Sequence, residues 1–493
     1  MPENSIFQLF DNLPQGGFAC RGKRKGDKDL TKEDTVRDIL LYLNDSPDAA
    51  KEINKCGQTP LHMACQKGEL SDIVTALLNI WPRAAREKDI FGKIPLQLAI
   101  CFGAPVEIVS ALLTTWPDSA KEKDDCGTLP LHTACGFGES IEIVSRLLTT
   151  WPDGAKEKDE DAHTPLHKAC MFRAPIQIVS ALLHAWPDGV KEKNKDGNTP
   201  LHLACSIRTK SEVVSALLHV WPDGAKEKDK YGNIPLHTAC SVRARLEIVT
   251  ALLHVWPDGV KIRNDDNNTP LHRACRSGSP LDVVSALMHA WPDGVKEKDK
   301  GGRTPLLLAV CTPEPRLEIV SALLDAWPDG VNEKDEEGNN SLYTAACIYG
   351  ASFNVIALLL DKWLGDKGNR KLSGKLVIDK CASVSRSSSI TTTLFSFVSA
   401  IYDTTNTTTN NTNNENPSSL NRSMILFRSI QMFVSIQMWN GVSLVLDKHP
   451  AVVKIMNVDT NAMAFLLSKV GRCCNLITMW NIICNEQDLL GGA

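Results

Sequence analysis

The chain has 493 residues and carries 54 Lys and Arg against 58 Asp and Glu, a formal net charge of −4. This length exceeds one ordinary globular domain, and the slightly acidic balance disfavours a nucleic-acid binder. The first residues lack the basic and apolar segments of a signal peptide, and the longest apolar stretch, residues 424–439, is short and contains Arg428, so we expect neither secretion nor a membrane span.

Residues 1–30 hold no periodic segment and are predicted to form a disordered tail. The sixteen cysteines of a chain without a secretory signal indicate a reducing compartment with free thiols, so a cytoplasmic location is expected. A basic cluster, Arg21–Lys28, could be read by nuclear import, which leaves a nuclear location as the alternative.

A period of 35 residues begins after this tail. Residues 31–58 supply one predicted helix and a segment, Ser46–Glu52, that aligns 35 positions before Trp81–Glu87, so they are interpreted as an N-terminal half-repeat cap. Residues 59–364 hold nine full units. Prolines mark the start of the first eight units: Pro60, Pro95, Pro130, Pro165, Pro200, Pro235, Pro270 and Pro305. Short helix pairs of this kind cannot bury an apolar face alone, so the units must stack.

One unit shows the pattern. Thr199 can cap a helix whose first residue is Pro200, and Leu201, Ala204 and Cys205 form an apolar stripe at helical spacing. A second helix follows over residues 211–220 and ends at Trp221-Pro-Asp-Gly, because proline cannot continue it. Each unit is therefore predicted to be a pair of short antiparallel helices.

The motifs Thr-Pro-Leu-His-x-Ala-Cys and Glu-Ile-Val-x-x-Leu-Leu, with Asp-x-x-Gly before the next Thr-Pro, make residues 31–364 similar to the ankyrin repeat family. The resemblance implies an all-α solenoid of stacked helix-turn-helix units with projecting hairpin-like fingers and one concave surface. This chain departs from the family in its period, which is 35 rather than 33. Ala162 and Asn267 replace the finger glycine in units four and seven, so those two turns are expected to differ.

Histidines recur at two fixed positions of successive units, and each such set is called a histidine column. The resemblance implies that the first histidine column joins neighbouring units by hydrogen bonds: His62, His132, His167, His202, His237 and His272. A second column lies at the ends of the second helices: His184, His219, His254 and His289. Neither column is paired with a nucleophile or carboxylate as a hydrolase requires, so no catalytic residue is predicted.

Cysteines share one register of the first helix: Cys65, Cys135, Cys170, Cys205, Cys240 and Cys275. Stacked helices lie roughly 8–10 Å apart, too far to bring these thiols within about 2.0–2.3 Å of one metal ion. We expect buried core cysteines and neither metal nor cofactor. The nine repeated tryptophans are expected to seal the outer layer, with an exposed aromatic stripe for a partner as the alternative.

Units four to six differ at the end of the first helix. Glycine occupies this place in four other units: Gly68, Gly103, Gly138 and Gly278. Three arginines replace it in between: Arg173, Arg208 and Arg243. The family implies a left-handed backbone here, which costs a non-glycine residue on the order of 1 kcal/mol, unless the longer turn of this chain relaxes it. Three successive departures from the glycine pattern favour a functional site here.

Basic and apolar side chains accompany these arginines at positions that the resemblance places on the concave face and the fingers. The predicted protein-binding residues are Lys168, Phe172, Arg173, Ile207, Arg208, Lys210, Tyr231, Val242, Arg243, Arg273 and Arg276. Because guanidinium groups grip carboxylates and apolar neighbours add desolvated contact, the expected partner is an acidic protein segment with apolar anchors. A solvated charged face is the alternative.

After unit nine the pattern fades. Residues 365–419 are predicted to be a linker with a disordered Ser-, Thr- and Asn-rich insertion, and residues 420–493 a degenerate ankyrin-like helical cap. A separate effector module is the rival interpretation, because residues 366–493 carry 12 basic and 8 acidic residues, net +4, against −8 for the rest.

The predicted function is that of a non-catalytic scaffold or adaptor, expected to be a monomer, that binds a partner polypeptide on the concave face. The alternative is an enzyme or effector whose active module lies in the C-terminal region, with the repeats recruiting its substrate. The chain has no G-x-S-x-G, H-E-x-x-H, dinucleotide-loop or kinase motif, which favours the first hypothesis.

Overall fold

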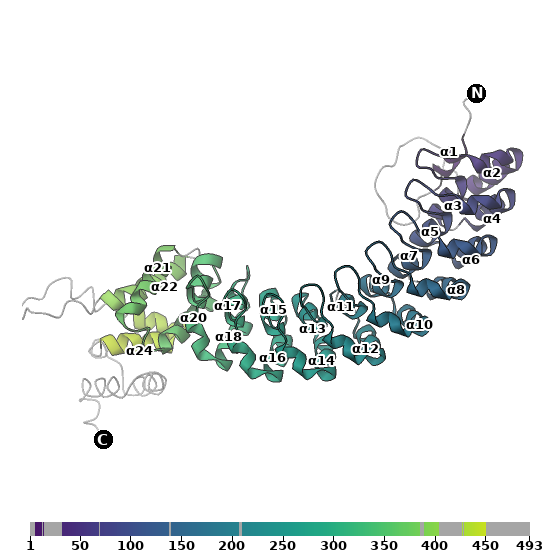
Figure 1. Cartoon of the computed structure of the whole chain (residues 1–493). Coiled ribbons are helices and arrows are strands. Elements are labelled where there is room, and N and C mark those ends of the chain that lie inside the picture. The colour runs from purple at the N-terminus through teal and green to yellow at the C-terminus, as the bar shows by residue number, and fades with distance from the viewer. Residues whose placement is uncertain are drawn as a thin grey trace, which may run out of the picture. The chain divides into compact units, whose positions relative to one another are not determined.

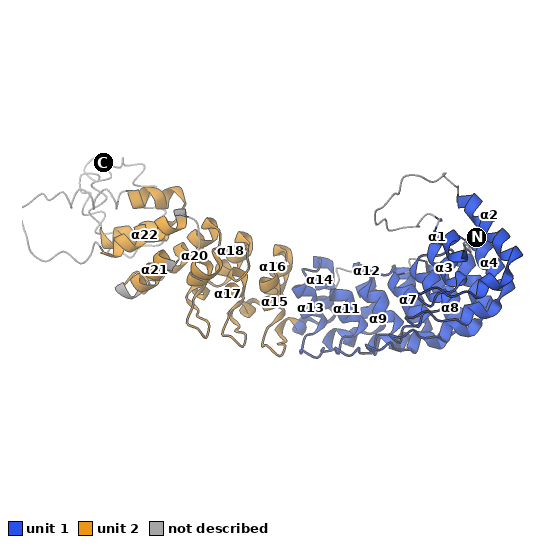
Figure 2. Ribbon diagram, turned by 90° about the horizontal axis from the view of Figure 1, so that it is seen from above, with its two compact units in different colours: residues 1–259 blue, residues 260–493 orange. Residues whose placement is uncertain are grey.

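The computed structural model describes residues 5–11, 13, 32–68, 70–137, 140–206, 210–384, 389–403, 426 and 428–449. The chain divides into two compact units, residues 1–259 and residues 260–493, which Figure 2 colours separately. The named elements of the described residues are all helices, and the one isolated bridge joins Lys334 to Asn340. The predicted all-α class built from repeated helix pairs is confirmed.

Nine helix pairs follow the N-terminal helices α1 (Ile6–Asp11) and α2 (Lys32–Asp45). The first helices are α3 (Pro60–Lys67), α5 (Pro95–Cys101), α7 (Pro130–Phe137), α9 (Pro165–Met171), α11 (Pro200–Ser206), α13 (Pro235–Ser241), α15 (Pro270–Ser277), α17 (Pro305–Val310) and α19 (Ser341–Tyr343), which continues as the π-helix η10 (Thr344–Tyr349). The second helices are α4 (Ser71–Ile80), α6 (Val106–Thr115), α8 (Ile141–Thr150), α10 (Ile176–Ala185), α12 (Ser211–Val220), α14 (Leu246–Val255), α16 (Leu281–Ala290), α18 (Leu317–Ala326) and α20 (Phe353–Gly365).

The helices stack in two layers within residues 1–259, as Figure 1 shows. First helices pack on first helices, from α3 through α13, and second helices on second helices, from α4 through α14. In one pair, Leu201, Ala204 and Cys205 of α11 and Val213 and Leu217 of α12 are buried. The stripe predicted from the 3.6-residue period is thus the core, and each pair buries it against its neighbours.

The first histidine column joins neighbouring repeats. His202 is buried, and its Nδ1 accepts the backbone N–H of Thr199 at 3.2 Å. Because Nδ1 accepts, Nε2 carries the ring proton and donates it to the carbonyl of Asn233 in the next repeat, at 3.1 Å. The repeat after the first uses Gln97 instead: its Oε1 accepts from Ile94 N–H and its Nε2 donates to the Thr128 carbonyl. The implied role of this column is confirmed.

The link after α2 and after each second helix from α4 to α18 is a 3₁₀-helix that starts at the proline. The nine are η1 (Pro47–Lys51), η2 (Pro82–Arg86), η3 (Pro117–Lys121), η4 (Pro152–Lys156), η5 (Pro187–Lys191), η6 (Pro222–Lys226), η7 (Pro257–Lys261), η8 (Pro292–Lys296) and η9 (Pro328–Asn332). Trp221, half-buried, lies over the start of η6. A Cβ at Gly224 would stand 2.8 Å from Trp221 Cε3, so the glycine of Trp-Pro-Asp-Gly makes room for the indole ring.

We expect Trp221→Ala to lower the free energy of unfolding by about 2 kcal/mol, roughly half the usual loss for a fully buried tryptophan, because the ring is half-buried. The thermal midpoint followed by circular dichroism measures the loss. Tyr231→Ala is the control, since Tyr231 is 58% exposed at a finger tip and should change stability by less than about 0.5 kcal/mol. An unchanged midpoint in Trp221→Ala would point to a binding role for the ring.

Each finger is a turn held by an Asp or Asn. Asp229 Oδ1 accepts the backbone N–H groups of Tyr231 and Asn233, both at 2.8 Å, and Gly232 has a φ of 72°. Neighbouring fingers are tied by backbone bonds such as Lys230 N–H to Asp196 O, at 2.9 Å. Ala162 and Asn267 keep a positive φ, 60° and 63°, so the expected difference in those turns is wrong. Asx hydrogen bonding holds the turn even where glycine is absent.

Among its described residues, the C-terminal part of the second unit contains the helices α21 (Leu372–Val384), α22 (Ser389–Asp403) and α24 (Trp439–Lys448), and residues 428–435 are also helical. Helices α21 and α22 lie within residues 365–419, where a linker was expected. Helix α22 forms because its apolar residues recur at helical spacing and are buried, including Leu394, Val398 and Ile401. Helix α24 packs on α20 and on α22. Residues 404–425 and 450–493, with most of the predicted insertion and cap, lie outside the described residues.

Candidate functional site

The turn between the two helices of a repeat is strained where arginine replaces glycine. Arg173 has a φ of 62° and Arg243 a φ of 57°, against 70° at Gly103. The hydrogen bonds match as well, since Ala174 N–H reaches the Ala169 carbonyl at 2.9 Å and Ala104 N–H the Ala99 carbonyl at 2.8 Å. The longer turn of this chain therefore does not relax the left-handed geometry, and each arginine carries its cost.

The arginine side chains reach solvent. Arg173 and Arg243 are exposed, as is Lys210 at the start of α12, and Val242 beside Arg243 is half-exposed. Arg173 and Lys210 form no ion pair with any other residue that the structure describes. Ile207 and Arg208, the centre of the predicted group, lie outside the described residues.

Lys168 has a different role from the one predicted. Its Nζ lies 2.7 Å from Asp159 Oδ2, and the exposed fractions of the two side chains are 19% and 4%. Burial alone would raise the pKa of Asp159, but hydrogen bonds from Lys168 and from the His163 N–H lower it. Lys168 is thus paired inside its own repeat and is a poor candidate for gripping a partner's carboxylate.

The aromatic members of the predicted group are both exposed. Tyr231, at its finger tip, lies under Lys230, whose Nζ is 5.0 Å from the ring centroid. Phe172 is 47% exposed, and its ring centroid lies 5.7 Å from that of Phe137. Arg273 and Arg276 belong to the second unit, where Arg276 is exposed and Arg273 is partly buried.

Sequence reasoning missed two members of this surface. Phe102 and Phe137, 49% and 66% exposed, stand 70 and 35 positions before Phe172 in the same register. The signal was present in the period itself, because the register that holds Ile207 and Val242 in later repeats holds phenylalanine in three earlier ones.

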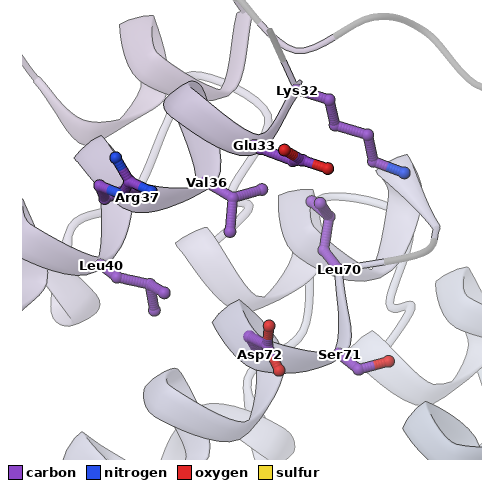
Figure 3. Close-up of a pocket in the computed structure, with 8 residues that line it drawn as sticks. All are labelled: Lys32, Glu33, Val36, Arg37, Leu40, Leu70, Ser71 and Asp72. Carbon is purple, nitrogen blue, oxygen red and sulfur yellow. The ribbon is translucent and has the colours of Figure 1, made fainter.

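Two clefts carry polar groups but no catalytic arrangement. The first, of about 630 Å³, lies between α2 and α4 and is lined by Lys32, Glu33, Arg37, Asp72 and Ser71, with apolar residues between them (Figure 3). No histidine lines it to activate the serine. The second, of about 560 Å³, includes Asp361.

The carboxylate of Asp361 already accepts hydrogen bonds from within the protein. It accepts the backbone N–H of Asn440 at 2.8 Å and the Asn440 side chain at 3.1 Å, at the start of α24, while burial raises its pKa. No cluster of three or more metal-binding side chains occurs among the described residues, and none of their helices combines the length and apolar character needed to cross a bilayer.

The cysteine register is buried as predicted, and burial raises the pKa of the Cys170 thiol to about 12. Such a thiol stays protonated near neutral pH and behaves as a small apolar side chain. The second histidine column is exposed at the ends of α10, α12, α14 and α16. Neither column supplies a reactive group.

Most of the repeats match a known family of proteins. The sequence matches a family model described as ankyrin repeats (3 copies) over residues 31–123, 103–191, 174–264, 220–299 and 247–335. Among solved structures, the chain is similar to the ankyrin repeat domain of human ASB11, at 24% sequence identity and a TM-score of 0.40, over 48% of this chain and 98% of that one. A search of curated proteins gave no match. The family match runs from the residue before α2 to three residues past the repeat link η9.

Proposed function

Because the chain belongs to the ankyrin repeat family, whose repeats are generally protein–protein interaction modules, we propose that it is a non-catalytic scaffold or adaptor that binds a partner polypeptide. The binding surface is the face formed by the ends of the first helices in the N-terminal unit, and the partner presents an acidic segment with apolar anchors. Guanidinium groups bind carboxylates through paired hydrogen bonds, and the apolar neighbours supply desolvated contact.

The observation that carries this proposal is the strained, exposed arginine at the end of α9 and again at the end of α13. Glycine at Gly103 makes the same turn without the strain, so the turn itself gives no reason for arginine at Arg173. Strain retained at exposed, charged residues is typical of binding surfaces.

Affinity purification of the full chain from cell extract, read by quantitative mass spectrometry, tests the proposal. We expect proteins retained by the natural chain to fall about tenfold or more with Arg173→Glu and Arg243→Glu together, because each reversal repels a carboxylate. Lys156→Glu is the control, since Lys156 is an exposed cation on η4. Equal recovery with all three chains would rule this surface out.

For the C-terminal region we propose a cap that shields the last repeat, rather than an enzyme module. Its described residues are tied to that repeat: Asn440 at the start of α24 donates its backbone N–H to Asp361 of α20 at 2.8 Å, and Arg370 Nε donates to the Leu364 carbonyl at 2.6 Å. The one buried carboxyl in the nearby cleft, Asp361, is engaged at the start of α24.

We expect residues 366–493 expressed alone to show no cooperative unfolding transition, because a cap gains its core from the neighbouring repeat. Circular dichroism during thermal denaturation measures this, with the full chain as the reference. A sharp transition in the fragment would favour a separate module and revive the effector hypothesis.

A further inference from the structure

We propose that the N-terminal unit bears a two-part docking surface for an extended segment of a partner protein that has an apolar half and an acidic half. The apolar part is the phenylalanine column, which is Phe102, Phe137 and Phe172. The acidic half lies against the basic turns, which are Arg173, Lys210, Arg243 and Arg245. This inference rests on the proposed function and specifies the partner's chemistry.

The phenylalanine column contains one pair of contacting rings, Phe137 and Phe172. Of the four phenylalanines that are more than a third exposed in the described part of the chain, three lie in this one register of consecutive repeats. Phe172 leans toward the preceding repeat, so that a Cβ at Gly136 would meet its ring at 3.4 Å, and its centroid is 5.7 Å from that of Phe137. Single exposed apolar residues are ordinary, but exposed aromatic rings aligned in consecutive repeats, two of them in contact, are typical of an interaction site.

The turns between the two helices of a repeat become basic along the stack. The first turns of α6, α8, α12 and α14 each carry one acidic residue, which are Glu107, Glu142, Glu212 and Glu247, and the first turn of α10 has none. From that repeat onward the turns are basic, with Arg173, Lys210 and Arg245 exposed and in no ion pair with another described residue. A partner's carboxylates are therefore attracted to the turns of the later repeats, where these cations are exposed.

The dimensions set the length that an extended segment needs. From Phe102 to Arg243 the surface crosses four repeat steps, each roughly 8–10 Å, which makes about 32–40 Å. About 10–12 residues of extended chain span that distance, whereas a helix would need more than about 20. Phe172 adjoins Arg173 in sequence, so the apolar half of the segment ends where the acidic half begins.

A random 20-residue peptide library displayed on phage, selected on the full-length protein, tests the inference. One variant replaces all three column phenylalanines with serine, the residue that this register holds at Ser277. A second replaces Arg173 and Arg243 with glycine, as at Gly103. Phe91→Ser is the matched control, because Phe91 is 61% exposed on a finger outside the column. Melting curves by circular dichroism verify that each variant is folded.

We expect selected peptides to pair an apolar run with an acidic run, and each variant set to weaken their dissociation constants about tenfold or more while Phe91→Ser leaves them unchanged. Peptides that bind all variants equally would overturn this surface but leave protein binding intact. Failure to recover any peptide would count against both proposals. A 20-nucleotide single-stranded DNA that binds the natural chain and not the glycine variant, with no peptide recovered, would overturn the assignment to a protein partner.

Discussion

Acidification from pH 7.5 to pH 5 is expected to destabilise the repeats by about 2 kcal/mol for each of His132, His167 and His272. Burial lowers the pKa of His132 to about 4, of His167 to about 3 and of His272 to about 4. An unfolded histidine titrates near about 6.5. Below that pH these histidines bind protons in the unfolded chain but stay neutral in the folded chain. The stability that they contribute is therefore fully present above about pH 6.5 and declines as the pH falls toward 4.

The chain contains the control for this experiment. Gln97 makes the same two hydrogen bonds as the histidines but has no titratable proton. Replacing His132, His167 and His272 with glutamine should therefore preserve stability at pH 7.5 and remove about 2 kcal/mol per site of the acid-induced loss. Urea unfolding followed by circular dichroism at both pH values measures the difference, in which the contributions of carboxyl groups cancel. Equal acid losses in the two chains would show that other groups cause the effect.

Arg370→Ala should lower the free energy of unfolding of the second unit by about 3–5 kcal/mol. Arg370 is 4% exposed, and it bonds to the Asp447 carboxylate and donates from Nε to the Leu364 carbonyl at 2.6 Å. Its removal leaves Asp447, 18% exposed, as a charge without its counter-ion in a largely dry site.

Lys296→Ala is the comparison for Arg370→Ala, because it also removes one cation from an ion pair in the same unit. Lys296 and Asp293 are 55% and 74% exposed, so this loss should stay below about 1 kcal/mol. Guanidinium-induced unfolding of both variants separates the two cases. Losses of similar size would mean that the contact between α24 and the end of α20 contributes little to stability.

The repeats were predictable from sequence because each of their contacts recurs at a fixed offset. The start of α11 at Pro200, the burial of Cys205 and the bond from His202 to the next repeat all follow from a pattern seen many times in one chain. The π-helix η10 in the last repeat was not predicted, because no second copy of that segment exists for comparison.

The remaining differences have local physical causes. Pro222 was expected only to end the second helix, yet its fixed φ also suits the first residue of η6. Glycine is needed at Gly224 because the Trp221 ring fills the space that a side chain would take. Serine- and threonine-rich composition concealed α22, whose apolar residues Leu394, Phe395 and Val398 keep the helical period.

The candidate surface was predicted in part. The substitution of arginine for glycine was visible in the sequence, but whether the turn would relax required backbone geometry, and the φ of 62° at Arg173 decides it. The pairing of Lys168 with Asp159 could not be read from spacing, since only this repeat places a lysine over its finger carboxylate.

The joint between repeats uses a main-chain acceptor. His62, His132 and His167 donate to the carbonyls of Lys93, His163 and Asn198, three residues that share nothing except a peptide group. This hydrogen bond therefore needs no matched side chain in the next unit, so a gene duplication or deletion of one whole 35-residue segment among these histidine-bearing repeats keeps the same bond at the new junction. The number of repeats, and with it the length of the proposed binding surface, can change one repeat at a time while the fold is kept.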